Sequence, residues 1–195
     1  MLKKTYTKAI ILCLALSLSA IATAGNKKTA EKADDPTPLG LVFGKTTIEE
    51  ALIILKKEGG TITNSGNRRI CGDTLNPYVE GYFLNGVNIQ GVTATKVWFL
   101  NGVLMELTYE LSGNFEQFND QLKTKYGDPS KSLEIGGMSR YSWLFKNMEL
   151  AFEITFSSIT MDYSNLQLLQ ESQSIDGKVC AEAHNKAMRQ IQKGF

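Results

Sequence analysis

Acidic residues on two predicted hairpins are the first candidates for chemistry. The set comprises Glu106, Glu110, Glu149, Glu153 and Asp162. Paired carboxylates carry out general acid–base catalysis in glycosidases, so this set supports a hydrolase hypothesis, with carbohydrate as the substrate class. The five residues nevertheless fall at alternating strand positions that we expect to face solvent, which is typical of an ordinary polar sheet surface.

Other catalytic patterns are missing from the sequence. His184 is the single histidine, and it follows Cys180 by four residues on one predicted helix. That spacing is poor geometry for a Cys-His nucleophilic pair. The chain contains no G-x-S-x-G, H-E-x-x-H, Walker or dinucleotide-binding glycine pattern. We therefore expect no catalytic residue, no cofactor and no metal site.

The N-terminus has the pattern of a secretory signal peptide. Three lysines among the first eight residues precede an apolar stretch over residues 9–21, and a small-x-small cleavage pattern ends at Ala24. The alternative is a membrane anchor, but the apolar run is short and no charge cluster follows it. Cys13 has no small residue before it, so it is a poor lipid-attachment site. We expect a periplasmic or secreted protein cleaved after Ala24.

Processing leaves a chain long enough for one domain. Removing the first 24 of 195 residues leaves 171, and the formal charge changes from +1 to about −2 because three lysines are lost. This balance argues against nucleic acid as a partner. The processed chain has no second long apolar run, so we expect no transmembrane segment in it. Residues 25–38 are charged and proline-containing, which predicts a flexible leader before a single domain over residues 39–195.

Cys71 and Cys180 are the two cysteines that remain after processing. In an oxidising compartment an even number of cysteines predicts a disulfide. Free thiols, a nucleophile or a metal ligand are the alternatives, and the absence of C-x-x-C spacing argues against a redox or zinc role.

Asn101-Gly102 predicts a two-residue hairpin turn within residues 93–111. An uninterrupted register would place eight residues on a core face: Ala94, Trp98, Leu100, Val103, Met105, Leu107, Tyr109 and Leu111. The opposite face then carries three apolar residues, Val97, Phe99 and Leu104, which form a candidate protein-binding patch. If a helix or the segment over residues 61–91 covers this patch, it is core instead.

The remaining periodicity predicts an α+β fold. Helical patterns start near Thr46 and Asn114, each ahead of antiparallel strands, which gives two helix-plus-strand halves over residues 39–111 and 112–163. Polar residues 61–78 suggest loops. A C-terminal helix is expected over residues 176–193, with Asp176 as its N-cap. We expect the helices to pack on one face of an antiparallel sheet.

Two stretches resemble known envelope proteins. F-G-K-T-T-I-E-E-A-L, residues 43–52, resembles the helix start of β-lactamase inhibitory proteins and of the SmpA/OmlA outer-membrane assembly lipoproteins. V-W-F-L-N-G-V-L, residues 97–104, is similar to the W-F-x-[DN]-G-V-L hairpin of the inhibitory proteins. The resemblance implies helices layered on a sheet and a role in binding other proteins in the cell envelope. It identifies no target, and no lipobox is present.

Three functions follow as hypotheses. The first is a non-catalytic module in the periplasm or outside the cell that binds another envelope or secreted protein. The second is the carbohydrate hydrolase that uses strand carboxylates. The third is a carrier with an apolar pocket for a small ligand between the helices and the sheet. The sequence leaves the partner, the ligand and the oligomeric state open.

We predict that the exported protein begins at Gly25, because the small-x-small pattern ends at Ala24. The intact mass of protein recovered from the periplasm or the medium should match residues 25–195. Retention of residues 1–24, or a lipid on Cys13, would contradict the assignment of compartment.

Overall fold

The structure is a computed structural model that describes residues 34–193. The predicted signal peptide, with its cleavage site at Ala24, lies outside the described residues, as does the first part of the predicted leader. Among residues 34–193, no helix combines the length and the apolar character needed to span a lipid bilayer.

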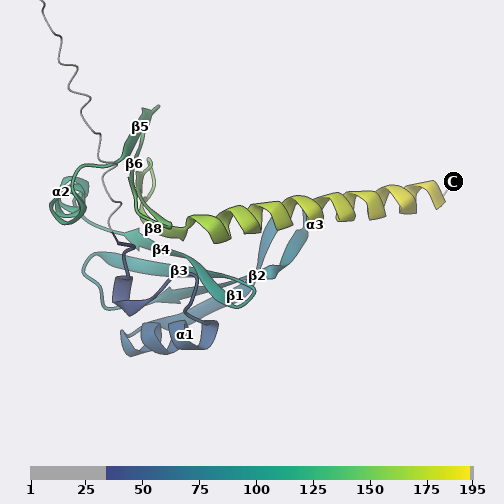
Figure 1. Ribbon diagram of the computed structural model, residues 1–195, viewed down its shortest axis with the longest axis horizontal. Coiled ribbons are helices and arrows are strands. Elements are labelled where there is room, and N and C mark those ends of the chain that lie inside the picture. The colour runs from purple at the N-terminus through teal and green to yellow at the C-terminus, as the bar shows by residue number, and fades with distance from the viewer. Residues whose placement is uncertain (1–33, 194–195) are drawn as a thin grey trace, which may run out of the picture. The chain divides into compact units, whose positions relative to one another are not determined.

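One antiparallel sheet and three α-helices make up the described chain (Figure 1). The strand order is β1-β2-β3-β4-β8-β7-β6-β5. The elements are the 3-10 turn η1 (Pro38–Gly40), α1 (Ile48–Lys57), β1 (Thr61–Cys71), β2 (Thr74–Asn85), β3 (Val92–Leu100), β4 (Val103–Leu111), α2 (Phe115–Tyr126), β5 (Lys131–Ile135), β6 (Met138–Leu144), β7 (Met148–Ile154), β8 (Ile159–Asn165) and α3 (Leu166–Lys193).

The predicted α+β architecture of two helix-plus-strand halves is confirmed. In each half a helix precedes a four-stranded meander, α1 before β1–β4 and α2 before β5–β8. The last strands of the two meanders, β4 and β8, pair with each other and join them into one sheet. The segment over residues 61–91 supplies β1 and β2, which are two of the four strands of the first half.

Side-chain caps set the start of the first two helices. Asn114 caps α2 as expected, and its Oδ1 accepts a hydrogen bond from the backbone N of Glu116 at 2.8 Å. The cap of α1 is Thr47, one residue later than predicted, and it forms a capping box with Glu50. Thr46 is instead buried, and its Oγ1 accepts a hydrogen bond from the backbone N of Val42. Both helices contribute to the main core on one face of the sheet.

The predicted register of the β3–β4 hairpin is right at the turn and wrong beyond it. Leu100 faces Val103 and Phe99 faces Leu104, but Trp98 faces Glu106 because Met105 forms a bulge. Because of this extra residue, the side chains predicted to share one core face are divided between the two sides of the sheet. Leu107, Tyr109 and Leu111 lie in the main core. Trp98, Leu100 and Met105 consequently belong to a second, smaller cluster with Val79, Leu168 and Ile175.

The candidate patch of Val97, Phe99 and Leu104 is wrong as a binding surface. All three side chains are 0% exposed and belong to the main core. These side chains are buried because other parts of the first half cover them. Leu41, Phe43 and α1 pack on this face, and the backbone N of Leu104 donates to the carbonyl of Thr46 at 2.9 Å. The alternative stated above, that a helix makes this patch core, describes the structure.

Residues 61–78 form strands rather than the predicted loops. β1 pairs with β2 along its whole length, from Thr61–Asn85 to Cys71–Thr74, with three register shifts. It is an edge strand with mostly exposed side chains. Its polar character and irregular pairing remove the alternation by which a strand is recognised.

The C-terminal helix begins at Leu166, ten residues before the predicted start. Asn165 caps it, since its Oδ1 accepts a hydrogen bond from the backbone N of Leu168 at 3.0 Å. Asp176 is therefore interior to the helix and not its N-cap. The first half of α3 covers the second cluster, on the sheet face opposite α1 and α2 (Figure 1).

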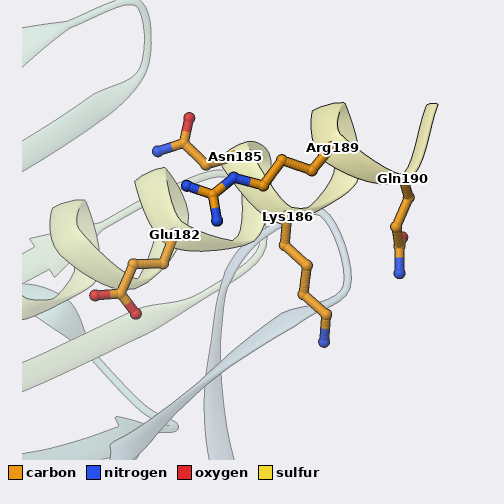
Figure 2. A pocket seen from close by; sticks show the side chains of 5 residues that line it. All are labelled: Glu182, Asn185, Lys186, Arg189 and Gln190. Carbon is orange, nitrogen blue, oxygen red and sulfur yellow. The ribbon is translucent and has the colours of Figure 1, made fainter. Parts of the chain in front are cut away.

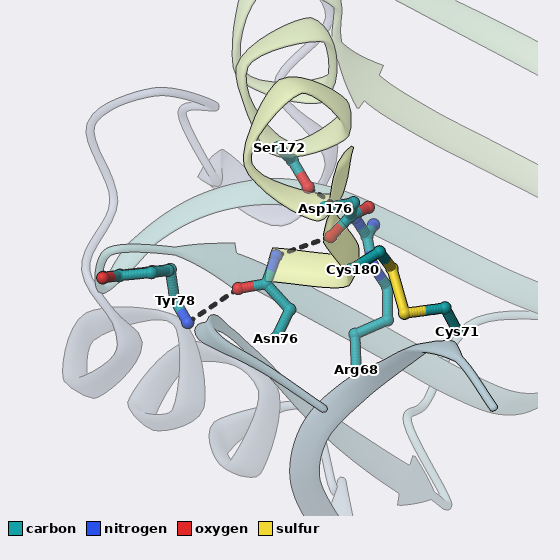
Figure 3. A network of polar contacts seen from close by, with 7 residues as sticks. All are labelled: Arg68, Cys71, Asn76, Tyr78, Ser172, Asp176 and Cys180. Carbon is teal, nitrogen blue, oxygen red and sulfur yellow. Dashed lines mark hydrogen bonds and ion pairs between the residues drawn. A yellow bond between two sulfur atoms is a disulfide. The ribbon is translucent and has the colours of Figure 1, made fainter. Parts of the chain in front are cut away.

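Polar contacts and a disulfide attach α3 to the β1–β2 hairpin (Figure 3). Arg68 donates to Asp176 Oδ2 at 2.6 Å and to the hydroxyl of Ser172, and Asn76 donates to Asp176 Oδ1 at 2.6 Å. The predicted Cys71–Cys180 disulfide is confirmed, with the two Cα atoms 6.0 Å apart. Both carboxylate oxygens of Asp176 are thus engaged, and the position of the helix is set by directional contacts.

The end of the predicted leader packs against the domain. Pro36 is buried, and Asp35 accepts hydrogen bonds from the backbone N and the side-chain Nδ2 of Asn147, both at 2.7 Å. These contacts hold residues 35 and 36 to the β6–β7 turn, so the domain begins before residue 39.

We predict that Phe99→Ala lowers the free energy of unfolding by about 3–5 kcal/mol, because it leaves a cavity beneath α1. Phe156→Ala is the matched control, since that ring is 90% exposed, and it should change the free energy by less than about 0.5 kcal/mol. Denaturant titration of both variants measures the difference. Equal effects of the two substitutions would contradict the buried assignment of Phe99.

Candidate functional site

The five strand carboxylates lie on one face of the sheet, but they are half-buried and not fully exposed to solvent as expected. Directly paired residues of antiparallel strands point to the same side, so the register defines rows across the sheet. Glu106, Ser164 and Glu149 form one row. Thr108, Asp162 and Ala151 form the next, and Glu110, Thr160 and Glu153 form the third. We call the surface made by Glu106, Glu110, Glu149, Glu153 and Asp162 the acidic face.

Cations neutralise three of these carboxylates. Arg140 contacts Glu153 at 3.2 Å, the cross-strand pair expected from the β6–β7 register, and it contacts Glu149 at 3.5 Å. Lys96 Nζ lies 2.5 Å from Glu110. Within residues 34–193, neither Glu106 nor Asp162 forms an ion pair at salt-bridge distance. These two lie diagonally across the β4–β8 pairing, at the centre of the acidic face.

Burial and mutual repulsion disfavour charge at this central pair. Burial raises the pKa of Glu106 above its ordinary value, and the neighbouring Asp162 raises that pKa further, while Arg68 and Arg140 oppose the shift. Burial likewise raises the pKa of Asp162, against hydrogen bonds from Thr108 and Thr160. Thr160 Oγ1 lies 3.3 Å from Asp162 Oδ2. The pair is therefore more stable when protonated or when a cation reaches it.

An aromatic side chain adjoins the central pair. Trp98 pairs directly with Glu106 across the β3–β4 register, so it lies on the acidic side of the sheet and not in the main core as predicted. Its ring covers Gly81, where an added Cβ would lie 2.4 Å from ring carbons. Phe83 packs edge-on against it with ring centroids 5.7 Å apart. The sequence pattern assigned Trp98 to the wrong side of the sheet, because it does not reveal the bulge at Met105. That bulge shifts the register between β3 and β4 just after the turn.

The Cys180–His184 pair is not a catalytic arrangement, and two other prominent side chains, Trp143 and Arg69, have structural partners. Cys180 is bonded to Cys71, so it cannot serve as the nucleophile of a pair with His184, whose side chain is exposed beside the disulfide. Trp143 lies in the main core, and its Nε1 donates to the carbonyl of Gly127 at 2.8 Å. Arg69 reaches only the exposed Asp73.

A hollow of about 480 Å³ lies along the distal part of α3 (Figure 2). Glu182, Asn185, Lys186, Arg189 and Gln190 line it, and all five belong to the same helix. A surface formed by neighbouring turns of one helix lacks the convergent walls of a ligand site. Among the described residues, no group of three or more His, Cys, Asp or Glu side chains is arranged to hold a metal ion.

The raised pKa values generate a pH prediction. Protonation of Glu106 and Asp162 is easier in the folded than in the unfolded chain, so the free energy of unfolding falls as pH rises from their ordinary pKa values through the folded ones. We predict that Glu106→Gln and Asp162→Asn each raise Tm at pH 7–8 and weaken this decline. Glu171→Gln, at an exposed site on α3, is the isosteric control and should leave the profile unchanged. A lower Tm of both central variants at pH 8 would contradict the prediction.

Comparisons with known proteins assign no family. No protein-family model matches the chain, and no curated protein matches it. Among solved structures, the chain is similar to a DUF4309 family protein (YjgB) from Bacillus subtilis. That similarity has a TM-score of 0.32 at 14% sequence identity, over 65% of this chain and 82% of the other. A similarity this weak indicates neither the fold nor the function of the chain.

Proposed function

We propose that this protein is a non-catalytic binding module of the cell envelope, periplasmic or secreted, that holds a protein partner against its acidic face. The observation that carries the proposal is the central pair, Glu106 and Asp162, two adjacent half-buried carboxylates without a salt-bridge partner within residues 34–193. A basic side chain of a partner would relieve their repulsion.

Charge and chemistry of the face favour a protein ligand. A desolvated ion pair at an interface contributes specificity, and removal of one charge is costly because the other is left unpaired. Trp98 beside Glu106 supplies an aromatic contact next to the charges, a combination common among residues that dominate binding energy. Arg140 and Lys96 form ion pairs with the surrounding carboxylates. The central pair is therefore the place where a cation of the partner would bind most favourably.

The disulfide supports the compartment. Cys71 and Cys180 are separated by 109 residues, and a bond of this kind persists in oxidising surroundings such as the periplasm or the exterior of the cell. This agrees with the secretory signal expected at the N-terminus.

A carbohydrate hydrolase is the second candidate. The observation that favours it is the raised pKa of both central carboxylates, because a carboxyl whose pKa is raised is more readily protonated and so better suited to act as a general acid. Under this alternative, Glu106→Gln abolishes turnover of a glycoside. Under the binding proposal no turnover exists to lose.

The test is capture of a partner from envelope extract by mature, disulfide-bonded protein. We predict that the double variant Glu106→Gln/Asp162→Asn captures at least tenfold less partner than the native protein. The reason is that removal of an interfacial charge pair costs about 2 kcal/mol or more of binding free energy. Glu49→Gln/Glu116→Gln, in the first turns of α1 and α2, is the matched control and should capture as the native protein does. Equal capture by both double variants would refute a role for the acidic face.

A further inference from the structure

A cavity of about 200 Å³ lies between α2 and the sheet, on the side away from the acidic face. Phe118 and Leu122 of α2 form one wall, and Leu111 and Met161 of β4 and β8 form the opposite one. Tyr163 completes the lining from β8. The walls come from different elements and converge, as those of a ligand site do.

The volume restricts the class of ligand. An engineered apolar cavity of about 150 Å³ holds benzene, whereas sites for drug-sized molecules occupy about 300 Å³ or more. A cavity of 200 Å³ accordingly fits one aromatic ring with one or two substituents.

One wall of the cavity is held in place by packing. The Phe118 ring lies against Gly91, where an added Cβ would be 2.6 Å from Cζ of that ring. The same ring packs against Phe152 with centroids 6.5 Å apart. Because this wall is fixed before a ligand arrives, little ordering accompanies binding.

Tyr163 brings a hydroxyl group to the apolar lining, and a ligand would compete there with the contacts that this hydroxyl makes with Met161 and Tyr126. Its side chain is 5% exposed, and its hydroxyl contacts the sulfur of Met161 at 3.7 Å, a weak acceptor. The ring of Tyr109 packs edge-on against it, and the Tyr109 hydroxyl has no partner among the described residues. Burial raises the pKa of Tyr163, and the adjacent Tyr126 adds to the shift, so the phenol remains a neutral donor.

The cavity opens between polar side chains. Gln90, Gln121 and Lys125 are exposed and line it together with the apolar walls. Lys125 Nζ lies 5.0 Å from the centroid of the Tyr126 ring, at the C-terminal end of α2. A small molecule can therefore enter from solvent without unfolding of the helix.

We propose that this cavity binds a small monocyclic phenol, with the ring between α2 and the sheet and the ligand oxygen accepting a hydrogen bond from the Tyr163 hydroxyl. The site is independent of the acidic face and of any protein partner.

The test compares two probes that differ by one hydroxyl, p-cresol and toluene, by calorimetry and amide chemical-shift mapping on mature, disulfide-bonded protein. We expect p-cresol to bind about three- to tenfold tighter than toluene, the ratio that one hydrogen bond supplies. Tyr163→Phe should remove this preference and leave the affinity for toluene unchanged. Shifts should be confined to α2, the ends of β4 and β8, and the segment over residues 89–92, which also lines the cavity.

A variant that fills the cavity tests its location. Met161→Phe should weaken both probes at least tenfold, and Leu133→Phe, at an exposed site on β5, should weaken neither. If neither probe binds, if Tyr163→Phe keeps the preference for p-cresol, or if Met161→Phe binds like the native protein, the proposal is wrong. Should Met161→Phe fail to fold, shifts of the native protein outside α2, β4, β8 and residues 89–92 would overturn the proposal.

Discussion

The pairing of β4 with β8 is the interaction on which the rest of the structure depends. These strands end their respective meanders, and six residue pairs, from Glu106–Ser164 to Leu111–Ile159, join two four-stranded units into one sheet. On one side the pairing sets Leu107 beside Tyr163 in the main core. On the other it sets Thr108 beside Asp162. The cavity lining and the acidic face are thus opposite sides of the same two strands.

Local sequence predicted the elements better than it predicted their faces. The Asn101-Gly102 turn is present with positive φ at both residues, as its type requires. The bulge at Met105 then reverses the alternation, and no turn or propensity signal marks it. The same limit explains why the sequence pattern predicts the start of α3 ten residues too late. Its first turns are rich in Gln and Ser, and their partners lie on β1 and β2, distant in sequence.

The sequence predicted which carboxylates share one face of the sheet, but it did not predict which of them pair with a cation. Alternation placed Glu149, Glu153 and Asp162 on one side of their strands, which the register bears out. Which carboxylates have a cation depends on contacts across strands, such as Arg140 with Glu149. The isolation of Glu106 beside Asp162 arises from the β4–β8 pairing, between residues more than fifty positions apart. The disulfide was predictable because the number of cysteines and the expected compartment are enough to predict it.

The two faces of the sheet are stabilised by different means. α1 and α2 pack on a continuous apolar core, so burial of nonpolar surface holds them. α3 covers a cluster with only three fully buried members, Val79, Leu100 and Met105, which is too small to hold a 28-residue helix by burial alone. The Asp176 contacts and the disulfide make up the difference, since directional bonds and a covalent link need little apolar area. This arrangement covers one end of the polar face, while Glu106 and Asp162 form no ion pair at salt-bridge distance within the described residues. The disulfide and the Asp176 contacts thereby fix the boundary of the acidic face.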